Sequence, residues 1–361
     1  MAVTSPSRSV VLAAGGTAGH VEPALNLAHS LAQVDSGIHI TVLGGRRGLE
    51  NILVPARGLP LQTFDAAPLP RTLSWSDVKR VAQVVRATWQ ARRLLRSQHP
   101  AVVVGFGGYV AAPVYLAAWS LSIPIVVHEA NARPGIANRL GARLTRHVVT
   151  AAQPNLPNAQ VLGIPLNPRI SGLDRSMMRD SARAALGLPR EGTVLLVFGG
   201  SQGAQRLNAA VLAALPGLTA AGVTVLHAVG RANPLPPPAS GYHPVHYLDH
   251  MEQAYAAADL AVTRAGALTC AELTAVGLPA IYVPLPIGNG EQRLNALPVV
   301  QAGGGVLLDD AQCSGEALQA QVLDLVQTPG RLDQMGRAAH TSGHRDASAA
   351  LAELVVSVMN H

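Results

Sequence analysis

The chain has 361 residues and a formal net charge of +6, with 48% hydrophobic, 13% charged and 3% aromatic residues. This length exceeds one typical domain and predicts two. The abundance of Ala, Val, Leu and Gly is typical of parallel sheets covered by helices on both faces. The positive charge favours anionic partners such as nucleotides, phospholipid surfaces or nucleic acid, without choosing among them.

The sequence also argues against some classes of site. Cys270 and Cys313 are its only cysteines and form no CxxC or Cys/His cluster. Neither a disulfide framework nor a zinc site is therefore expected, and a reducing compartment fits. No segment approaches the roughly 18 uninterrupted apolar residues of a membrane span, which predicts a soluble or peripheral protein.

Strand-like and helix-like segments alternate along the chain. The first half has apolar segments typical of buried strands at Val10–Ala13, Ile38–Leu43, Ala101–Gly105, Ile125–His128 and His147–Thr150. The second half repeats the plan at Thr193–Phe198, Val223–Ala228, Ala258–Val262, Ala280–Val283 and Gly305–Leu308. The alternation predicts an α/β fold of two Rossmann-like, doubly wound domains that face a cleft.

The boundary between these domains is expected within Val161–Pro168, where prolines break regular structure. We expect an N-terminal domain of residues 1–163 and a C-terminal domain of residues 164–344. A terminal amphipathic helix, about residues 345–361, is expected to pack back on the first domain.

Three loops of the first domain follow predicted strands and should meet at one sheet edge. They are GGTAGH at Gly15–His20, GFGGYV at Gly105–Val110 and HEAN at His128–Asn131. The first loop lacks the GxGxxG pattern, and no acidic residue convincingly ends the second strand, which weighs against a dehydrogenase. Taken alone, a glycine turn of this kind could serve packing only.

Four polar side chains of these loops are candidates for a site: His20, Tyr109, Glu129 and Asn131. A lone histidine is more often a surface residue than a base. His20, however, directly follows a glycine loop, and its ordinary pKa near 6.5 would let it accept a proton at neutral pH. We therefore expect the four residues to line one site.

The second domain carries an unusual number of polar groups at helix starts, above all in the stretch Thr263–Ala296. A turn at Gly266 is followed by a predicted helix over Cys270–Val276, which Gly277 ends. The first turn should offer free N–H groups to an anion. Glu272 is badly placed for a phosphate but well placed for sugar hydroxyls, and a ribose would suit it.

A second glycine loop, in Phe198–Asn208, places Ser201 and Gln202 where they could bind phosphate or sugar oxygens. It lacks the GK[ST] ending of a nucleotide-hydrolysing loop, which favours a diphosphate. Tyr247–Met251 could contact a flat base or simply pack in the core.

The motifs GGTAGH, GFGGY, HEAN, GGSQGA, AGALTCAE and GEQRLNA follow the order and approximate spacing of the MurG family and cover nearly the whole chain. The sequence thus resembles glycosyltransferases of the two-domain GT-B type. The resemblance implies inverting transfer of N-acetylglucosamine (GlcNAc) from UDP-GlcNAc to the C4 hydroxyl of the muramyl sugar of undecaprenyl-pyrophosphoryl lipid I. The product, lipid II, serves peptidoglycan synthesis. We expect no cofactor, no metal and no nucleic-acid partner.

The family roles fall on matching residues. His20 is the first candidate for the base and Glu129 the second. Ser201 would meet the diphosphate, Leu248 the uracil through its backbone, and Gln292 the transferred sugar. The candidate substrate-binding residues are Thr17, Ala18, Gly19, Tyr109, Asn131, Ser201, Leu248, Ala267, Leu268, Thr269, Cys270, Ala271, Glu272 and Gln292.

Some positions depart from the family pattern. Ile164–Asn167 stands where an Asn-Pro-x-Arg sequence is common, so Asn167 or Arg169 would have to replace the family arginine. Ala18 occupies a position where glycine is usual, and Glu291 one where His or Gln often precedes Gln292.

A lipid acceptor implies a peripheral protein at the cytoplasmic face of the plasma membrane. The segment Asp77–Gln98 mixes basic and apolar residues, and Trp119 could join its face. The alternative is a basic helix that simply faces solvent. The candidate contacts with an anionic membrane are Lys79, Arg80, Arg86, Trp89, Arg92 and Arg93.

Two other functions remain open. A UDP-sugar 2-epimerase of the same fold would need extra acidic catalytic groups and no lipid-facing surface. A non-catalytic UDP-sugar-binding protein would not need His20, Glu129 and Asn131.

Overall fold

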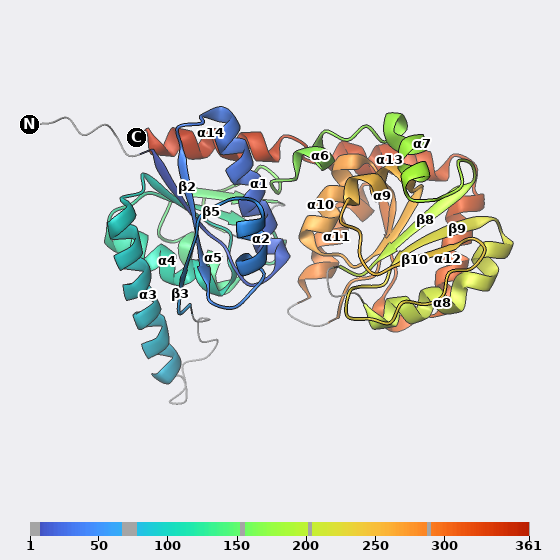
Figure 1. Ribbon diagram of the computed structural model, residues 1–361, viewed down its shortest axis with the longest axis horizontal. Coiled ribbons are helices and arrows are strands. Elements are labelled where there is room, and N and C mark those ends of the chain that lie inside the picture. Colours follow the sequence, from blue (N-terminus) through green and yellow to red (C-terminus); the bar gives the residue numbers. More distant parts are fainter. Residues whose placement is uncertain (1–7, 67–77, 152–155, 201–203, 287–289, 361) are drawn as a thin grey trace, which may run out of the picture. The chain divides into compact units, whose positions relative to one another are not determined.

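The computed structural model describes residues 8–66, 78–151, 156–200, 204–286 and 290–360. The chain forms two compact units, Met1–Leu166 with Asp346–His361 and then Asn167–Arg345. Each unit is a parallel β-sheet between helices (Figure 1), so the predicted pair of Rossmann-like domains is confirmed. The units divide between residues 166 and 167, three residues after the boundary predicted from the sequence, which lies between residues 163 and 164.

Within the described ranges, the first unit has a seven-stranded sheet in the order β3-β2-β1-β4-β5-β6-β7. Neighbouring strands are all parallel. The strands are β1 Ser9–Ala13, β2 His39–Gly45, β3 Leu61–Phe64, β4 Val102–Gly105, β5 Ile125–Glu129, β6 His147–Thr150 and β7 Ala159–Val161. The helices are α1 Ala18–Val34, α2 Glu50–Ala56, α3 Val78–Gln98, α4 Gly108–Ser120, α5 Ile136–Gly141 and α14 Ala347–Met359.

Two hydrophobic layers cover the two faces of this sheet. Alternate residues of β1 point to opposite faces, so Val10 and Leu12 belong to one layer and Val11 and Ala13 to the other. The first layer includes α1 and α14, and the second includes α3 and α4. Helix α14 packs on α1 and so joins the chain's last helix to the first unit.

The second unit has, among its described residues, a six-stranded parallel sheet in the order β10-β9-β8-β11-β12-β13. Its strands are β8 Thr193–Phe198, β9 Val223–Ala228, β10 Tyr242–Val245, β11 Leu260–Thr263, β12 Ala280–Tyr282 and β13 Gly305–Leu307. Its helices are α6 Pro168–Ser171, α7 Arg175–Ala185, α8 Gln205–Ala220, α9 Met251–Ala257, α10 Ala267–Val276, α11 Glu291–Gln301, α12 Gly315–Gln327, α13 Arg331–Ser342 and the 3-10 helix η2 Asp310–Gln312.

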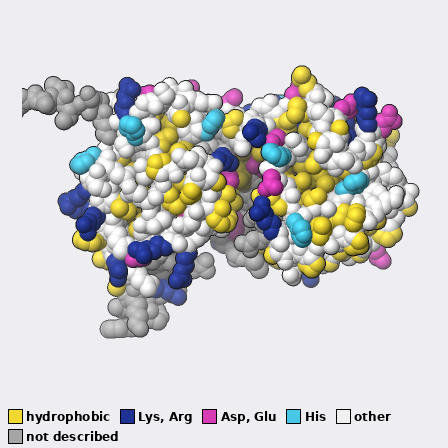
Figure 2. Space-filling model, viewed as in Figure 1, with side chains coloured by type: hydrophobic (Ala, Val, Ile, Leu, Met, Phe, Trp, Pro, Cys, Tyr) yellow, Lys and Arg dark blue, Asp and Glu magenta, His cyan; other side chains and the backbone are white. Residues whose placement is uncertain are grey.

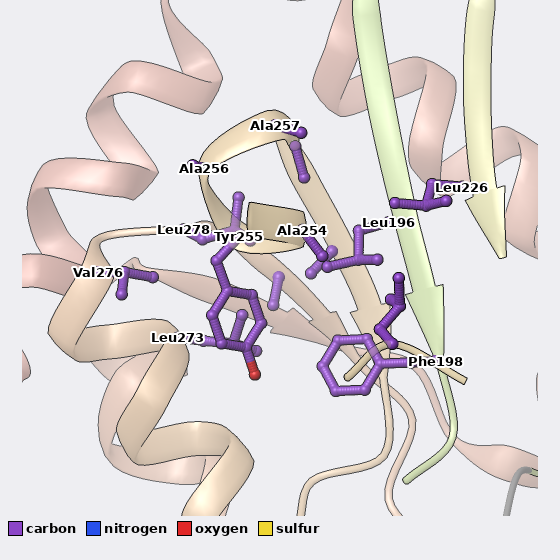
Figure 3. Close-up of a cluster of buried hydrophobic side chains, with 14 of the residues drawn as sticks. Leu196, Phe198, Leu226, Ala254, Tyr255, Ala256, Ala257, Leu273, Val276 and Leu278 are labelled. Atoms are coloured by element: carbon purple, nitrogen blue, oxygen red, sulfur yellow. The ribbon is translucent and has the colours of Figure 1, made fainter. Parts of the chain in front are cut away.

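Two hydrophobic layers cover this sheet as well. Part of one layer is drawn in Figure 3, where Phe198 and Tyr255 lie among aliphatic side chains. The two rings have centroids 6.2 Å apart. Tyr255 is fully buried, and its hydroxyl oxygen lies at the edge of the group drawn. A buried hydroxyl requires a hydrogen-bond partner.

Over the described part of the chain, no helix combines the length and the apolar character that crossing a bilayer would require.

Candidate active site

The three predicted loops of the first unit leave one edge of its sheet. Strands β1, β4 and β5 are neighbours and run parallel, so their carboxyl ends lie side by side. The segments after them carry His20 in the first turn of α1, Tyr109 in the first turn of α4 and Asn131 in a loop. This is the edge at which doubly wound sheets bind ligands.

His20 lies in the first turn of α1, directly after the first glycine loop. Its Nδ1 is 3.1 Å from Thr17 Oγ1. A Cβ atom on Gly107 or Gly108 would lie 3.4 Å from the imidazole ring, so the loop after β4 passes close to that ring. Burial lowers the pKa of His20 below its ordinary 6.5, and the Glu50 charge partly opposes this. His20 is therefore largely neutral at pH 7 and able to accept a proton.

Tyr109 directs its hydroxyl into the first unit. The hydroxyl shares its one proton between the carbonyl oxygen of Arg47 and Glu50 Oε1, which is 3.1 Å away. Burial, followed by the charge and hydrogen bond of Glu50, raises the pKa of Tyr109 to about 12. Tyr109 is thus a neutral donor that holds Glu50, and its hydroxyl is already engaged there.

Glu129, the second candidate for the base, is 3% exposed and tied to its own loop. Its Oε1 accepts from the Asn131 N–H at 2.9 Å, and its Oε2 from the Gly135 N–H at 2.9 Å and from Asn138 Nδ2 at 3.0 Å. Burial raises the pKa of Glu129, and these hydrogen bonds oppose the rise. This geometry suits a carboxylate that shapes the loop carrying Asn131 better than one that exchanges protons.

In the second unit, α10 begins at Ala267 with Gly266 as its N-cap. The predicted start at Cys270 is therefore three residues late, because Ala267, Leu268 and Thr269 already form the first turn. Gly266 has no side chain to bond the N–H groups of that turn, and the turn is partly exposed. An anion could accept from these groups. Gly277 ends the helix in the left-handed conformation, as predicted.

Glu272 lies in the second turn of α10 and is half-buried. Its Oε2 accepts a 2.7 Å hydrogen bond from the hydroxyl of Tyr255. Burial and then the Glu272 charge raise the pKa of Tyr255 well above its ordinary value, so Tyr255 stays a donor. This hydrogen bond from the buried Tyr255 therefore fixes the orientation of the partly exposed Glu272 carboxylate.

The start of α11 packs against the same edge. Gln292 Oε1 accepts from the Leu285 N–H at 2.9 Å, and Asn295 Nδ2 is 3.3 Å from the Ala265 carbonyl. These bonds join α11 to the loop after β12 and to the loop before α10. The second unit therefore brings Glu272 and Gln292 to one edge on consecutive βα units.

Not every predicted site residue lies at that edge. The Cys270 side chain is buried in the core, burial raises its pKa to about 12, and its N–H donates to the Gly266 carbonyl, so neither group lies at that edge; substrate binding by Cys270 stays a prediction. The Leu248 side chain is also buried, which leaves its backbone as the relevant part. Ser201 and the neighbouring Gln202 lie outside the described residues. Ala271 is partly exposed beside Glu272.

The two candidates for the family arginine differ. Asn167 caps α6 by accepting from the Arg169 N–H at 3.0 Å. Arg169 is largely exposed and pairs with Glu252 at 3.6 Å. Of the two, only Arg169 has a charged side chain that could bind an anion.

The comparisons with known proteins agree along the chain. Residues 10–150 match the glycosyltransferase family 28 N-terminal domain, and residues 194–351 match the C-terminal domain of the same family. A relative from Acidothermus cellulolyticus is 55% identical over 96% of this chain and 96% of its own length. A relative from Mycobacterium sp. (strain KMS) is 52% identical over 97% and 95%. Both are named "UDP-N-acetylglucosamine--N-acetylmuramyl-(pentapeptide) pyrophosphoryl-undecaprenol N-acetylglucosamine transferase".

The chain belongs to the MurG family. Among solved structures, Acinetobacter baumannii MurG is similar with a TM-score of 0.77 and 28% identity, and the match covers 97% of this chain and 99% of that one. The UDP-GlcNAc 2-epimerase from Neisseria meningitidis has a TM-score of 0.67 at 14% identity, over 97% and 99%. That second likeness shows the GT-B fold alone.

Three buried side chains of this MurG-family chain were not predicted from the sequence. Glu50 and Tyr255 hold Tyr109 and Glu272 from inside the two units. Arg264, just before the N-cap of α10, donates to the Val283 carbonyl at 3.1 Å and to Asp310 at 2.6 Å. Each shapes a loop of the family's motifs without itself facing solvent, which is why no surface pattern reveals it.

Proposed function

We propose that the chain transfers GlcNAc from UDP-GlcNAc to the C4 hydroxyl of the muramyl sugar of lipid I, with inversion, to give lipid II for peptidoglycan synthesis. The single observation that carries the proposal is the 55% identity, over 96% of the chain, to a relative named for this transfer. The geometry of both units supports it, because each carries one half of the chemistry.

The first unit would supply the base. An inverting transfer requires a group that takes the proton of the acceptor hydroxyl as the oxygen attacks the anomeric carbon. In the tautomer in which His20 Nδ1–H donates to Thr17 Oγ1, 3.1 Å away, the lone pair is on Nε2. We assign Nε2 of His20 as that base. Glu129 is then a positioning residue for the loop of Asn131, since its oxygens are occupied.

The second unit would bind the donor. The N–H groups of Ala267, Leu268 and Thr269 would donate hydrogen bonds to the diphosphate, and the positive end of the α10 dipole would stabilise departing UDP. Glu272 would bind the ribose hydroxyls, and Gln292 the transferred sugar. The leaving group's new negative charge is thereby met by backbone donors, so we propose a transfer that requires no metal ion.

A membrane-binding face would bring the enzyme to its lipid acceptor at the cytoplasmic side. Helix α3 exposes Val85 and Trp89, which are 64% and 63% exposed. Trp119, at the end of α4, is 61% exposed, and Arg92 Nε joins the two helices by a 2.9 Å bond to Ser120 Oγ. Figure 2 shows Lys and Arg side chains gathered along the same helix. Exposed aromatic residues among cations are typical of an interfacial surface.

Among the candidate basic contacts, Arg80, Arg86 and Arg93 are exposed, whereas the Lys79 side chain lies outside the described residues. Arg86 lies 3.6 Å from Asp65, which also pairs with Arg46. This carboxylate weakens the contribution of Arg86 to an anionic surface. We propose the three exposed arginines, Arg80, Arg86 and Arg93, as charged contacts of the face.

Acceptor-dependent UDP release tests the assignment. With UDP-GlcNAc and a lipid I analogue, the protein should release UDP, and His20→Ala should lower kcat by roughly 10²- to 10⁴-fold with KM for the donor nearly unchanged. Glu272→Ala should chiefly raise that KM. His39, exposed at the start of β2, provides the matched control, and His39→Ala should retain full activity. Absence of acceptor-dependent UDP release from the folded wild type would refute the proposal.

A further inference from the structure

Glu50, at the start of α2, is a fully buried carboxylate with no role in any motif of the site. It accepts three hydrogen bonds from three different parts of the first unit. Oε2 accepts from the Gly16 N–H at 2.9 Å, and Oε1 accepts from the Gly45 N–H at 3.0 Å and from the Tyr109 hydroxyl at 3.1 Å. All three donors are neutral, so they stabilise the negative charge without cancelling it.

Glycines of the surrounding backbone make room for the Glu50 side chain. A Cβ atom on Gly15 would lie 2.7 Å from Glu50 Oε1, one on Gly44 2.8 Å from Cγ, and one on Gly48 2.2 Å from Oε2. Gly48 also has φ of +137°, which side chains rarely adopt. Gly15, Gly44 and Gly48 therefore make room for Glu50, whose carboxylate reaches Gly16 after β1, Gly45 at the end of β2 and Tyr109 in the first turn of α4.

Two of those loops surround His20. Gly16 directly precedes Thr17, which contacts the His20 ring, and Tyr109 directly follows Gly108, whose backbone lies against that ring. Glu50 binds one residue of each loop and so fixes both.

We propose that Glu50 is a positioning residue for the transfer, which holds the two loops about His20 and supplies the negative charge that stabilises the imidazolium formed when His20 takes the acceptor proton. This inference rests on the proposed function. The proton moves from the C4 hydroxyl to the imidazole, and Glu50 exchanges none. Glu50 would thus orient the base and stabilise its positive charge, as the carboxylate of a catalytic triad does for its histidine. Unlike that carboxylate, it would orient the histidine through the backbone of the neighbouring loops.

Two titratable groups near His20 keep one charge state in the working range. The pKa of Tyr109 of α4 is raised to about 12, and that of His128 of β5 is lowered to about 4, both chiefly by burial. Glu129 of β5 is bound to its own loop, and Glu22 of α1 is paired with Arg57 of α2 at 2.9 Å. On α14, which also packs on α1, the one charged residue, Glu353, is exposed. A charge effect on His20 is therefore traceable to Glu50.

Glu50→Gln is the decisive variant, because it keeps the size of the side chain and removes its charge. We expect kcat to fall roughly tenfold or more, from misplacement of the base, with KM for UDP-GlcNAc within about twofold. The acid limb of the kcat/KM profile should move to lower pH by a few tenths to about one unit, since an opposite charge near a histidine favours its protonated form. Glu50→Asp, which retains the charge, should lose rate but keep the acid limb of the wild type.

Two further variants distinguish the positioning role of Glu50 from a nonspecific effect of changing a residue in the first unit. Asp35→Asn removes a carboxylate of the same unit that pairs with Arg8 at 2.9 Å, and it should leave both rate and pH profile unchanged. Tyr109→Phe removes one of the donors to Glu50 and should lower kcat modestly without moving the acid limb. If Glu50→Gln does not fold, Glu50→Asp and Tyr109→Phe decide the positioning role by the same kcat-against-KM comparison.

NMR titration of His20 in wild type and Glu50→Gln gives a readout that does not require turnover. A lower His20 pKa in Glu50→Gln supports the inference even if the wild type transfers no sugar, an outcome that would refute only the proposed function. Conversely, an active wild type with a Glu50→Gln variant whose kcat, acid limb and His20 titration are all unchanged would overturn the inference.

Discussion

The hydrogen bond from Tyr255 to Glu272 offers a sharp test of the donor site, because Tyr255→Phe removes one hydroxyl and nothing else. The 2.7 Å distance is typical of a bond to a charged oxygen, and Tyr255 is fully buried. Such bonds contribute about 1.5–3 kcal/mol when both partners are buried. Glu272 is half-buried, so water can replace part of the lost bond, and we expect a loss of about 1 kcal/mol in the free energy of unfolding.

The effect on ligand binding follows from the same bond. In the variant, the Glu272 carboxylate must be ordered when the nucleotide binds, at a cost of about 0.5–1.5 kcal/mol for one side chain. The Kd for UDP should therefore rise roughly 2- to 12-fold. Isothermal titration calorimetry with UDP measures this change, and urea unfolding measures the loss of stability.

Tyr242→Phe is the matched control for this prediction. The hydroxyl of Tyr242, which lies on the edge strand β10, is also buried in the second unit, but it is 3.0 Å from Nδ1 of His227 on β9 and bonds none of the site residues. Its removal should lower stability and leave the Kd for UDP unchanged. The reasoning fails if Tyr255→Phe binds UDP as tightly as the wild type, or if Tyr242→Phe weakens UDP binding equally.

Three further predictions follow from the structure. Burial lowers the pKa of His128 and of His227 to about 4. Below the ordinary pKa of 6.5 the unfolded chain therefore binds protons that the folded chain excludes, and urea unfolding should show that the free energy of unfolding of each unit falls by about 2 kcal/mol between pH 7.5 and pH 5. A free energy of unfolding that does not change over this range would mean that water reaches these histidines and would contradict the prediction. Trp89→Ser or Trp119→Ser should reduce sedimentation with anionic vesicles severalfold, whereas Ile52→Ser, which changes a residue 67% exposed on α2, should not; equal losses would contradict the proposed face. EDTA should leave the rate of transfer unchanged, and an activity restored only by added metal would refute metal-independent transfer.

The central strands were predictable from the sequence. Strands β1, β4, β5 and β8 are buried on both faces of their sheets and appear as continuous apolar segments. The strands β3, β7 and β10 were not predicted. Each lies at a sheet edge, where one side of the strand is unpaired and polar residues or proline are tolerated, as at Pro244 in β10.

The site was predictable to the extent that it depends on chain order. Parallel strands bring the loops that follow them to one edge, so GGTAGH and GFGGYV could be brought together without coordinates. The side chains that act from inside could not. Glu50 and Tyr255 are joined to the site by contacts across 34 and 17 residues of sequence, and nothing local marks them. Cys270 shows a second limit, because its place in the motif does not reveal that its side chain points into the core.

The most direct measurement follows the sugar itself. Radiolabelled UDP-GlcNAc and a lipid I analogue are incubated with the protein, the products are separated, and the configuration of the new glycosidic bond is determined by NMR. The account predicts label in a lipid-linked disaccharide with a β-linkage to the C4 oxygen, because a single displacement inverts the α-anomer of the donor. Label in UDP-N-acetylmannosamine, an α-linked product, or no label in the lipid fraction would contradict it.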